Sequence, residues 1–306
     1  MAVNTIEYAK LMMNKLDQHA VIGLTSGWME ANAGQVIYNG GDEVKIPEMS
    51  TAGLADYNRD TGFVPGGITV KYNTYKMTQD RGRTFQLDSM DVDESGFVAT
   101  TTNVIKTFQE DEVIPEIDAY RYSKLATIAK AANQSEEINL TADNILSKLR
   151  EHIRAIQDLV GSDKRLVITM PSTILGLLED SPKIGKSINV ADFKQGQLNF
   201  KVKFIDDNPI IVAPSARLKT KYDVLDGVTG GQEKGGLKAS QDAKDINYLI
   251  TVEKAPIAIS KTDKLRIFSP DTNQLADAWK IDYRKYHDLW VKKQKEKQIF
   301  ACIKGA

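Results

Sequence analysis

The sequence has little of what marks secreted or membrane-bound proteins. Its 306 residues include one cysteine, Cys302, so neither an internal disulfide nor a site with several thiolate ligands can form. This usage is typical of a chain that folds in a reducing compartment. No apolar run approaches the roughly 18 residues of a membrane-spanning helix. The first residues contain Glu7 and Asp17 but no apolar core, unlike a secretory signal peptide. We therefore expect an intracellular protein without a membrane anchor.

The chain also lacks an excess of either charge. It has 40 lysine and arginine residues and 41 aspartate and glutamate residues, for a net charge of −1. This balance excludes a disordered polyanion and a basic protein that coats nucleic acid. Hydrophobic residues make up 42% of the sequence, which is ordinary for a globular protein. The length suits one elaborate domain or two modest ones.

Two ligand-binding motifs are present only in part. Residues 91–96 (DVDESG) match the first half of a calcium-binding EF-hand loop, but Thr102 stands at the position that requires a bidentate glutamate. An acidic helix N-terminus explains this segment better, because the helix dipole favours negative charge there. Residues 185–187 (GKS) resemble the end of a phosphate-binding loop, but Asp180 occupies the place of its first glycine. We expect a surface turn instead.

Nucleophilic and histidine-based sites have no sequence support either. His19, His152 and His287 lie far apart in the sequence, and no Gly-x-Ser-x-Gly elbow is present. His152 falls beside the apolar stripe of a predicted helix, so we expect a hydrogen-bonded histidine at the border of the core. The sequence therefore predicts no catalytic residue, no metal site and no cofactor.

An alternating pattern predicts a β-hairpin near residue 60. Val44, Ile46 and Met49 mark its first strand, and apolar residues from Ile68 to Met77 mark the second. The connection from residue 50 to residue 67 is glycine-rich. It is longer than the 12–15 residues or so beyond which structureless loops become uncommon, so we expect it to serve a function.

Helical spacing predicts two long helices. One runs over residues 94–132, with a kink or restart at Pro115 because proline removes a backbone hydrogen bond. The other runs from Thr141, as N-cap, to Gly161, which ends it. Its buried stripe is predicted to contain Ile145, Leu146, Leu149, Ile153 and Ile156. A further short amphipathic helix is expected over residues 3–19.

The rest of the chain indicates strands joined by turns. A buried strand is expected at residues 165–170, a turn at residues 206–208 and a mobile glycine-rich loop at residues 226–245. Strands follow at residues 247–252, 257–260 and 265–268, and residues 281–291 and 298–303 are expected to form a closing hairpin. Aromatic residues between Trp279 and Trp290 favour packing over nucleic-acid stacking, because aspartates lie among them. Together these elements predict the α+β class.

Two segments carry a resemblance to a known family. Residues 78–95 read TQDRGRTFQLDSMDVDES, and residues 113–123 in the following helix read VIPEIDAYRYS. They resemble major capsid proteins of tailed bacteriophages and prophages with the HK97-type fold, especially those from Gram-positive hosts. Residues 279–291 (WKIDYRKYHDLWV) are weakly similar to the same group.

The resemblance implies a division of the chain. It makes residues 1–42 an N-terminal arm and residues 43–78 an extended loop that crosses a neighbouring subunit. Residues 79–132 and 261–306 become a peripheral domain with its spine helix, and residues 133–260 an axial domain. Six inter-subunit contact candidates follow: Asp80, Arg81 and Arg83 at the base of the hairpin, and Tyr57, Arg59 and Phe63 near its tip.

The implied function is structural and not enzymatic. Pentamers and hexamers of this chain are expected to form an icosahedral shell around phage double-stranded DNA, assembled in the host cytoplasm. The implied partners are a separate scaffolding protein, a portal protein and DNA in weak non-specific contact, without N-terminal processing. The alternatives are an encapsulin-like compartment shell and, from a different class, a metal- or nucleotide-dependent enzyme.

Overall fold

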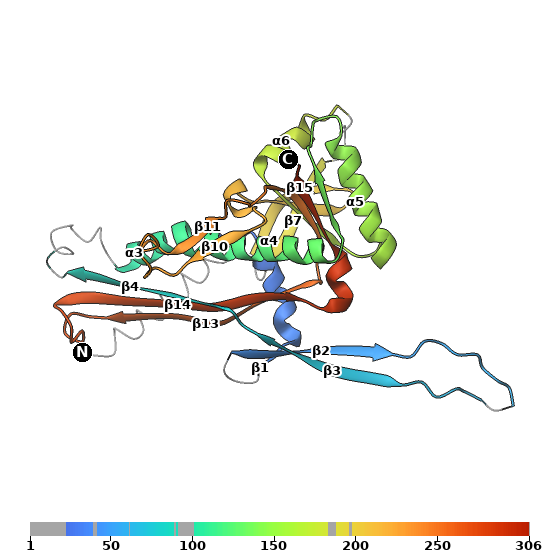
Figure 1. Ribbon diagram of the computed structural model, residues 1–306, viewed down its shortest axis with the longest axis horizontal. Coiled ribbons are helices and arrows are strands. Elements are labelled where there is room, and N and C mark those ends of the chain that lie inside the picture. Colours follow the sequence, from blue (N-terminus) through green and yellow to red (C-terminus); the bar gives the residue numbers. More distant parts are fainter. Residues whose placement is uncertain are drawn as a thin grey trace.

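The computed structural model describes residues 23–38, 42–60, 62–88, 90, 101–182, 188–195 and 198–305. The predicted helix at residues 3–19 and both partial ligand motifs, at residues 91–96 and 185–187, lie outside these ranges. In the described part, a compact α/β body stands at one end of a long sheet and a helix runs between them (Figure 1). A β-hairpin projects away from the body, in the direction opposite to the long sheet (Figure 1).

The body contains a mixed seven-stranded sheet. Its strands β5 and β15 are parallel, as are β6 and β9, and the other neighbouring strands run antiparallel. The order across the sheet is β5 (Ser135–Ile138), β15 (Ile299–Lys304), β12 (Ile246–Val252), β6 (Leu166–Met170), β9 (Asn208–Val212), β8 (Leu198–Ile205) and β7 (Ile188–Gln195). The β8–β9 turn has positive φ at Asp206 and Asp207, as the predicted turn requires.

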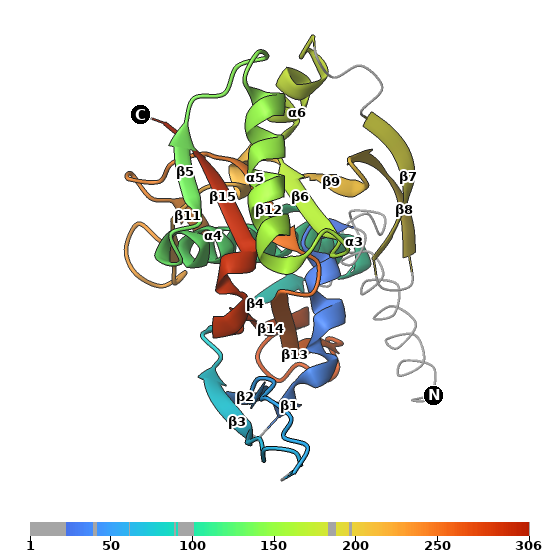
Figure 2. The ribbon, with the colours of Figure 1, turned by 90° about the vertical axis from the view of Figure 1, so that its right-hand side faces the viewer.

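Helices cover both faces of this sheet. On one face lie α5 (Ile145–Val160) and α6 (Ser172–Glu179), and on the other lies α4 (Ile114–Ala131) (Figure 2). Side chains alternate between the faces, so Leu166 and Ile168 of β6 pack toward α5 and Val167 packs toward α4. Central strands buried on both sides need apolar residues at every position, which explains the continuous apolar runs in the sequence.

The predicted stripe of α5 is confirmed, because all five of its residues are buried. Gly161, at φ 90°, ends the helix as expected. The predicted cap is wrong: α5 begins at Ile145, and the backbone N–H of Thr141 donates to the side chain of Asn144. A turn over residues 141–144 precedes the helix and takes the place that the prediction gave to its first turn.

The long helix is interrupted where the sequence predicted. It consists of α3 (Thr101–Phe108), a π-helical turn (Gln109–Val113) and α4, with Pro115 in the first turn of α4. Proline has no N–H to donate to the preceding turn, and a proline in the first helical turn loses no bond. The wider turn before it accommodates this change of hydrogen bonding.

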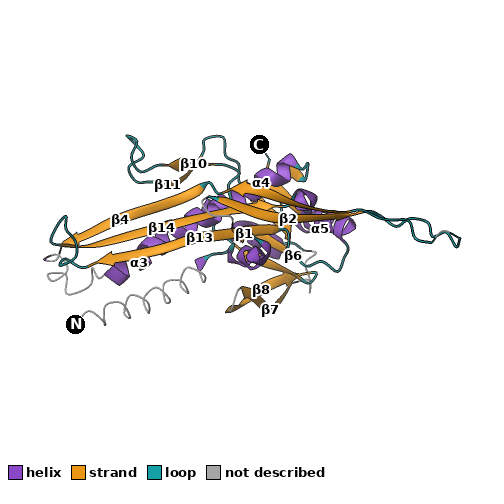
Figure 3. Cartoon of the chain, turned by 90° about the horizontal axis from the view of Figure 1, so that it is seen from below, coloured by secondary structure: helices purple, strands orange, loops and turns teal. Residues whose placement is uncertain are grey.

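A long three-stranded sheet runs beside this helix. Its order is β13 (Pro256–Phe268), β14 (Ala278–Val291) and β4 (Gln79–Asp88) (Figure 3). Residues 257–268 therefore form part of one strand with a bulge after Ser260, whereas the sequence predicted two strands. The predicted closing hairpin is also wrong, because β15 pairs with β12 and β5 and not with β14. A 3₁₀ turn (Lys293–Gln298) carries the chain from one sheet to the other.

The predicted hairpin near residue 60 is confirmed. Strands β2 (Glu43–Thr51) and β3 (Ile68–Lys76) pair antiparallel along their whole length, and β1 (Ile37–Tyr38) joins the base of β2. A 3₁₀ helix (Gly27–Gln35) precedes them. Part of the predicted loop at residues 226–245 is strand β11 (Gly236–Ala239). It pairs with β10 (Tyr222–Leu225), which precedes the loop, in a small sheet along the long helix.

Gly82 in β4 permits a close approach of two strands, and its substitution gives a testable result. A Cβ atom there would lie 2.8 Å from the backbone oxygen of Tyr283 in β14. We expect Gly82→Ala to push the strands apart and to lower the free energy of unfolding by about 1–3 kcal/mol, as overpacking does. Chemical denaturation measures this. Gly34→Ala is the control, since its Cβ meets no atom within 4 Å; equal stability of the two variants would contradict the expectation.

Candidate assembly interface

The base of the hairpin is packed against the body. Val44 and Ile46 of β2 are buried in one apolar cluster with Ile257 and Ile259 of β13. The ring of Tyr75 in β3 lies 5.8 Å from the ring of Trp290, which belongs to the same cluster. Even-numbered residues of β2 therefore face the body at this end.

The outer half of the hairpin carries its apolar residues on the opposite face. The register pairs Met49 with Val70, Pro47 with Tyr72 and Thr51 with Ile68, so these side chains share the face that is turned away from Val44 and Ile46. Met49 is 64% exposed, Ile68 71% and Val70 47%. The other face of the same segment carries polar pairs such as Ser50 with Thr69. The hairpin is thus an amphipathic ribbon whose apolar face (Pro47, Met49, Ile68, Val70 and Tyr72) is largely exposed in this chain.

The three predicted contact residues near the tip are all exposed. Tyr57 and Phe63 face each other across a small turn, with ring centroids 4.9 Å apart, and Phe63 is 88% exposed. Arg59 lies in that turn. The tip therefore exposes two aromatic rings, and a contact of these residues with another subunit stays a prediction.

The three predicted contact residues at the base bond within the chain. Asp80 accepts hydrogen bonds from Arg284 at 2.8 and 2.5 Å, and this guanidinium lowers the pKa of the Asp80 carboxyl. Arg81 pairs with Glu116 of α4 at 2.7 Å, and Arg83 donates to the backbone oxygen of Glu233 at 3.1 Å. These bonds tie β4 to β14, to the long helix and to the β10–β11 loop. A contact with another subunit through them stays a prediction.

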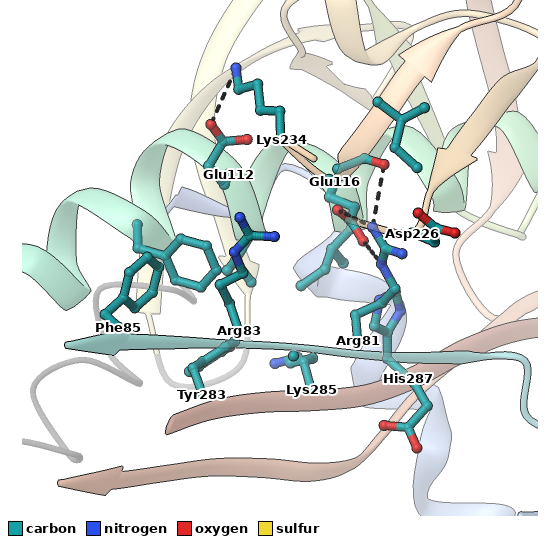
Figure 4. A pocket seen from close by; sticks show the side chains of 18 residues that line it. Arg81, Arg83, Phe85, Glu112, Glu116, Asp226, Lys234, Tyr283, Lys285 and His287 are labelled. Carbon is teal, nitrogen blue, oxygen red and sulfur yellow. Dashed lines mark hydrogen bonds and ion pairs between the residues drawn. The ribbon is translucent and has the colours of Figure 1, made fainter. Parts of the chain in front are cut away.

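Arg81 and Arg83 also line a cleft of about 330 Å³ between β4, the long helix and the β10–β11 loop (Figure 4). Lys234 of the loop pairs with Glu112 of the π-helical turn at 3.5 Å across its mouth. The floor is aromatic, with Phe85 and Tyr283 near the sheet. Cationic and anionic side chains line it in equal number, so the cleft has no strong preference for either charge. They are Arg81, Arg83, Lys234 and Lys285, and Asp80, Glu112, Glu116 and Asp226.

Sequence reasoning missed two buried carboxylates that fix the elements around the hairpin. Asp118 of α4 accepts hydrogen bonds from the backbone N–H and hydroxyl groups of Thr25 and Ser26, and from Arg217 at 2.9 Å. Asp288 of β14 bonds to Thr78 at the root of the hairpin. The partners named here lie 92 or more residues away in the sequence, so no local pattern indicates them.

Other polar residues of the described chain have structural roles. His152 bonds to the hydroxyl of Tyr248 at 2.8 Å and to Glu136 at 2.7 Å and stacks on Phe300, as predicted for a border histidine. Burial raises the pKa of the Cys302 thiol to about 11. Among the described residues, no group of three potential ligands is arranged to hold a metal ion, and none of the helices there could span a membrane.

His287 gives the chain an acid sensitivity that can be measured. It is buried, and burial together with the positive charges of Arg121, Lys285, Lys124 and Arg81 holds its pKa well below the usual value. In the unfolded chain it takes up a proton near pH 6.5. Stability is therefore unaffected above that pH and falls as the pH drops below it. The loss approaches about 1.4 kcal/mol per pH unit until the folded state is protonated.

Urea denaturation between pH 7.5 and 5 tests this expectation. His287→Gln should flatten the pH dependence in this window, because glutamine does not titrate. His152 also has a pKa lowered by burial, so His152→Gln is the comparison that measures the contribution of His152 to the pH dependence of stability. Carboxyl groups titrate mainly below the window. A pH profile of His287→Gln as steep as that of the wild type would contradict the assignment.

Comparisons with known proteins identify the fold. No protein-family model matches the sequence, and no curated protein does. Solved structures do match. A capsid structure of the cyanophage P-SCSP1u has a TM-score of 0.57 at 9% identity, over 88% of this chain and 85% of that one. A Gordonia phage Cozz structure has a TM-score of 0.55 at 13% identity, over 89% and 83%. A mature capsid of bacteriophage PhiM1 has a TM-score of 0.54 at 11% identity, over 87% and 83%.

These matches cover most of both chains, and they agree with the expectation drawn from residues 78–95 and 113–123. The chain therefore has an HK97-like α+β capsid fold, with the projecting hairpin and the long helix as parts of it. The Gram-positive host type stays a prediction.

Proposed function

We propose that this chain is the major capsid protein of a tailed bacteriophage or prophage, and that copies of it form a closed shell as pentamers and hexamers. The observation that carries the proposal is the apolar outer face of the hairpin, which projects from a fold otherwise known from capsids. Apolar surface of this kind gains free energy when another surface covers it. In a homo-oligomer the covering surface belongs to a second copy of the chain.

The proposed parts follow the division implied by the resemblance, with two adjustments from the sheets. One is that β13 begins at Pro256, before the boundary at residue 261. Residues 43–78 act as the extended loop, and residues 79–132 with the β13–β14 strands act as the peripheral domain. The seven-stranded sheet acts as the axial domain together with α5 and α6. Strand β15 belongs to this sheet by its pairing, although it lies within residues 261–306. Residues 1–42 are proposed as the N-terminal arm.

The proposed partners are other copies of the chain, a separate scaffolding protein, a portal protein and packaged double-stranded DNA. The proposed location is the virion capsid, assembled in the host cytoplasm. The net charge of −1 suits a wall that encloses DNA without binding it tightly, since phosphate contacts made by lysine and arginine dominate DNA affinity. The proposed role is structural, with no catalytic step.

A matched pair of substitutions on the hairpin tests the proposal. Met49→Lys places a charge on the apolar face, and Ser50→Lys places the same charge on the polar face one residue away; both positions are exposed. Wild-type chain, expressed with its scaffolding protein, should sediment as closed particles visible by electron microscopy. We expect Met49→Lys to abolish these particles and Ser50→Lys to retain them, with thermal unfolding of both subunits unchanged.

The contents of the particles decide between a virus and a compartment shell. DNA that resists nuclease inside purified particles supports the capsid, whereas a bound cargo enzyme and no DNA would support an encapsulin-like shell. Wild-type chain that stays monomeric with its scaffold present, or equal assembly of both lysine variants, would contradict the proposal.

A further inference from the structure

The direction of the hairpin depends on a link of two residues. The chain leaves β3 at Lys76 and enters β4 at Gln79, and these two strands belong to different sheets. Met77 and Thr78 are therefore the point at which one β-ribbon turns into another. The backbone conformation there is one determinant of the direction of the hairpin relative to the body.

A buried carboxylate holds this link. Asp288 of β14 accepts hydrogen bonds on one oxygen from the backbone N–H of Thr78 at 2.9 Å and from its hydroxyl at 3.0 Å. The other oxygen accepts from the hydroxyl of Tyr120 at 2.6 Å, from the ammonium of Lys124 and from the backbone N–H of Leu289 at 2.7 Å. The Asp288 side chain has no solvent exposure. These contacts tie the link to the sheet and to the long helix at once.

The charges of the group are matched. Lys124 neutralises the carboxylate and donates also to the hydroxyl of Tyr120 at 2.9 Å. Burial and the nearby charge of Asp288 raise the pKa of Tyr120, which keeps its hydroxyl protonated as a donor. Charge-assisted hydrogen bonds of this kind are short and directional.

The apolar cluster at the base of the hairpin restrains the orientation of the hairpin less than the carboxylate does. Val44, Ile46 and Met77 bury their side chains there, but hydrophobic burial is non-directional and tolerates rotation of the packed surfaces. The carboxylate, in contrast, requires Thr78 to present its N–H and hydroxyl to one oxygen. The directional restraint at the root of the hairpin thus comes from polar contacts. These are the contacts of Asp288 and the hydrogen bonds from the Tyr286 hydroxyl to the backbone oxygen of Met77 at 3.2 Å and from the Lys292 ammonium to that of Pro47 at 3.0 Å.

We propose that Asp288, with Tyr120 and Lys124, is the positioning group that sets the angle at which the hairpin leaves the body. The inference rests on the proposed function for its consequence: a hairpin held at one angle meets the neighbouring copy with one curvature, so shells close at one size. Loss of the group frees the angle without unfolding the subunit, and the shells become irregular or fail to close.

Distance measurements between spin labels test the angle on the unassembled subunit. Thr69→Cys on the polar face of the hairpin and Arg154→Cys on the outer face of α5 are both exposed label sites, and the native Cys302 is buried. The wild-type background should give one narrow distance distribution. We expect Asp288→Asn to broaden or shift it, because the amide presents donors to groups that are themselves donors. A distribution identical to wild type would overturn the proposal.

A milder pair of variants keeps the test valid if Asp288→Asn does not fold. Thr78→Val removes the hydroxyl and should broaden the distribution, whereas Thr78→Ser keeps the hydroxyl and should restore the wild-type distances. Ile250→Val, in the core of the seven-stranded sheet, is the control for a general loss of stability and should leave the distances unchanged. Equal distributions for Thr78→Val and Thr78→Ser would also overturn the proposal.

Electron microscopy of particles then tests the consequence. With Asp288→Asn or Thr78→Val, we expect a wider spread of particle diameters, or open sheets, where the wild type gives one size. If wild-type chain forms no particles, the proposed function fails while the distance data still decide the positioning role. If wild-type particles form and variant particles have the same uniform size, the link between hairpin angle and shell curvature is overturned.

Discussion

Replacing residues 53–66 by an Asn-Gly turn is expected to leave a folded subunit that forms no closed shell. The backbone N–H of Ala52 donates to the backbone oxygen of Gly67 at 2.9 Å, one pair beyond Thr51 and Ile68. A two-residue turn of the type that suits right-handed strand twist can therefore join Ala52 to Gly67 directly. The removed segment contains Tyr57 and Phe63 and contributes no residue to the apolar clusters of the body. Its loss removes the tip that is proposed to contact a neighbouring copy and leaves the base of the hairpin packed as before.

Thermal and chemical unfolding measure the first half of this expectation. A shorter closed loop loses less chain entropy, so the stability should be unchanged or raised by up to about 2 kcal/mol. Sedimentation and electron microscopy measure the second half. The control replaces only Tyr57 and Phe63 by serine in the full-length loop. It separates the contribution of the aromatic rings to assembly from the contribution of the loop length. Normal particles from the truncated chain would contradict the extended-loop assignment.

Asp118→Ala is expected to cause the largest loss of stability of any single substitution considered. The carboxylate is completely buried, and its removal leaves Arg217 and the donor groups of Thr25 and Ser26 without their acceptor. Breaking a buried, hydrogen-bonded ion pair by removal of one partner costs about 3–5 kcal/mol.

The same carboxylate anchors the 3₁₀ helix that follows Ser26. That helix buries Trp28 and Met29 in the core cluster on the α4 side of the large sheet, so their packing should loosen as well. Urea denaturation, with tryptophan fluorescence as a second signal, measures the effect. Asp242→Ala is the control, since Asp242 forms an exposed pair with Lys221 and its removal should change the stability little. A similar effect of both variants would show that Asp118 does not anchor this segment.

Local patterns predicted the elements whose packing repeats along the chain. Strand alternation found the hairpin, helical spacing found the buried stripe of α5, and Pro115 marked the interruption of the long helix. These features succeeded because side-chain period and backbone hydrogen bonding are decided by neighbours within a few residues. The Thr141 cap failed because a turn with its own hydrogen bonds competed for the same residues.

Pairings between distant segments could not be read in this way. The sequence suggested that residues 281–291 and 298–303 pair with each other, since they are separated by a short charged turn. The structure places the second of them between β5 and β12, because its alternate faces fill both sides of the large sheet. The candidate contact residues show the same limit: Asp80, Arg81 and Arg83 were found as a charged group, but their partners within the chain were not.

By itself, the sequence determined the class of fold, a β-hairpin with a long glycine-rich connection, and the absence of a charge excess or of several cysteines. These properties depend on composition and short-range order alone. Only the tertiary structure decided that the apolar residues of the outer hairpin share the face turned away from the body, and that Asp118 and Asp288 hold segments 92 to 210 residues distant. The physical reason is that strand register and buried hydrogen bonds are settled by three-dimensional packing, in which residues far apart in the chain become nearest neighbours.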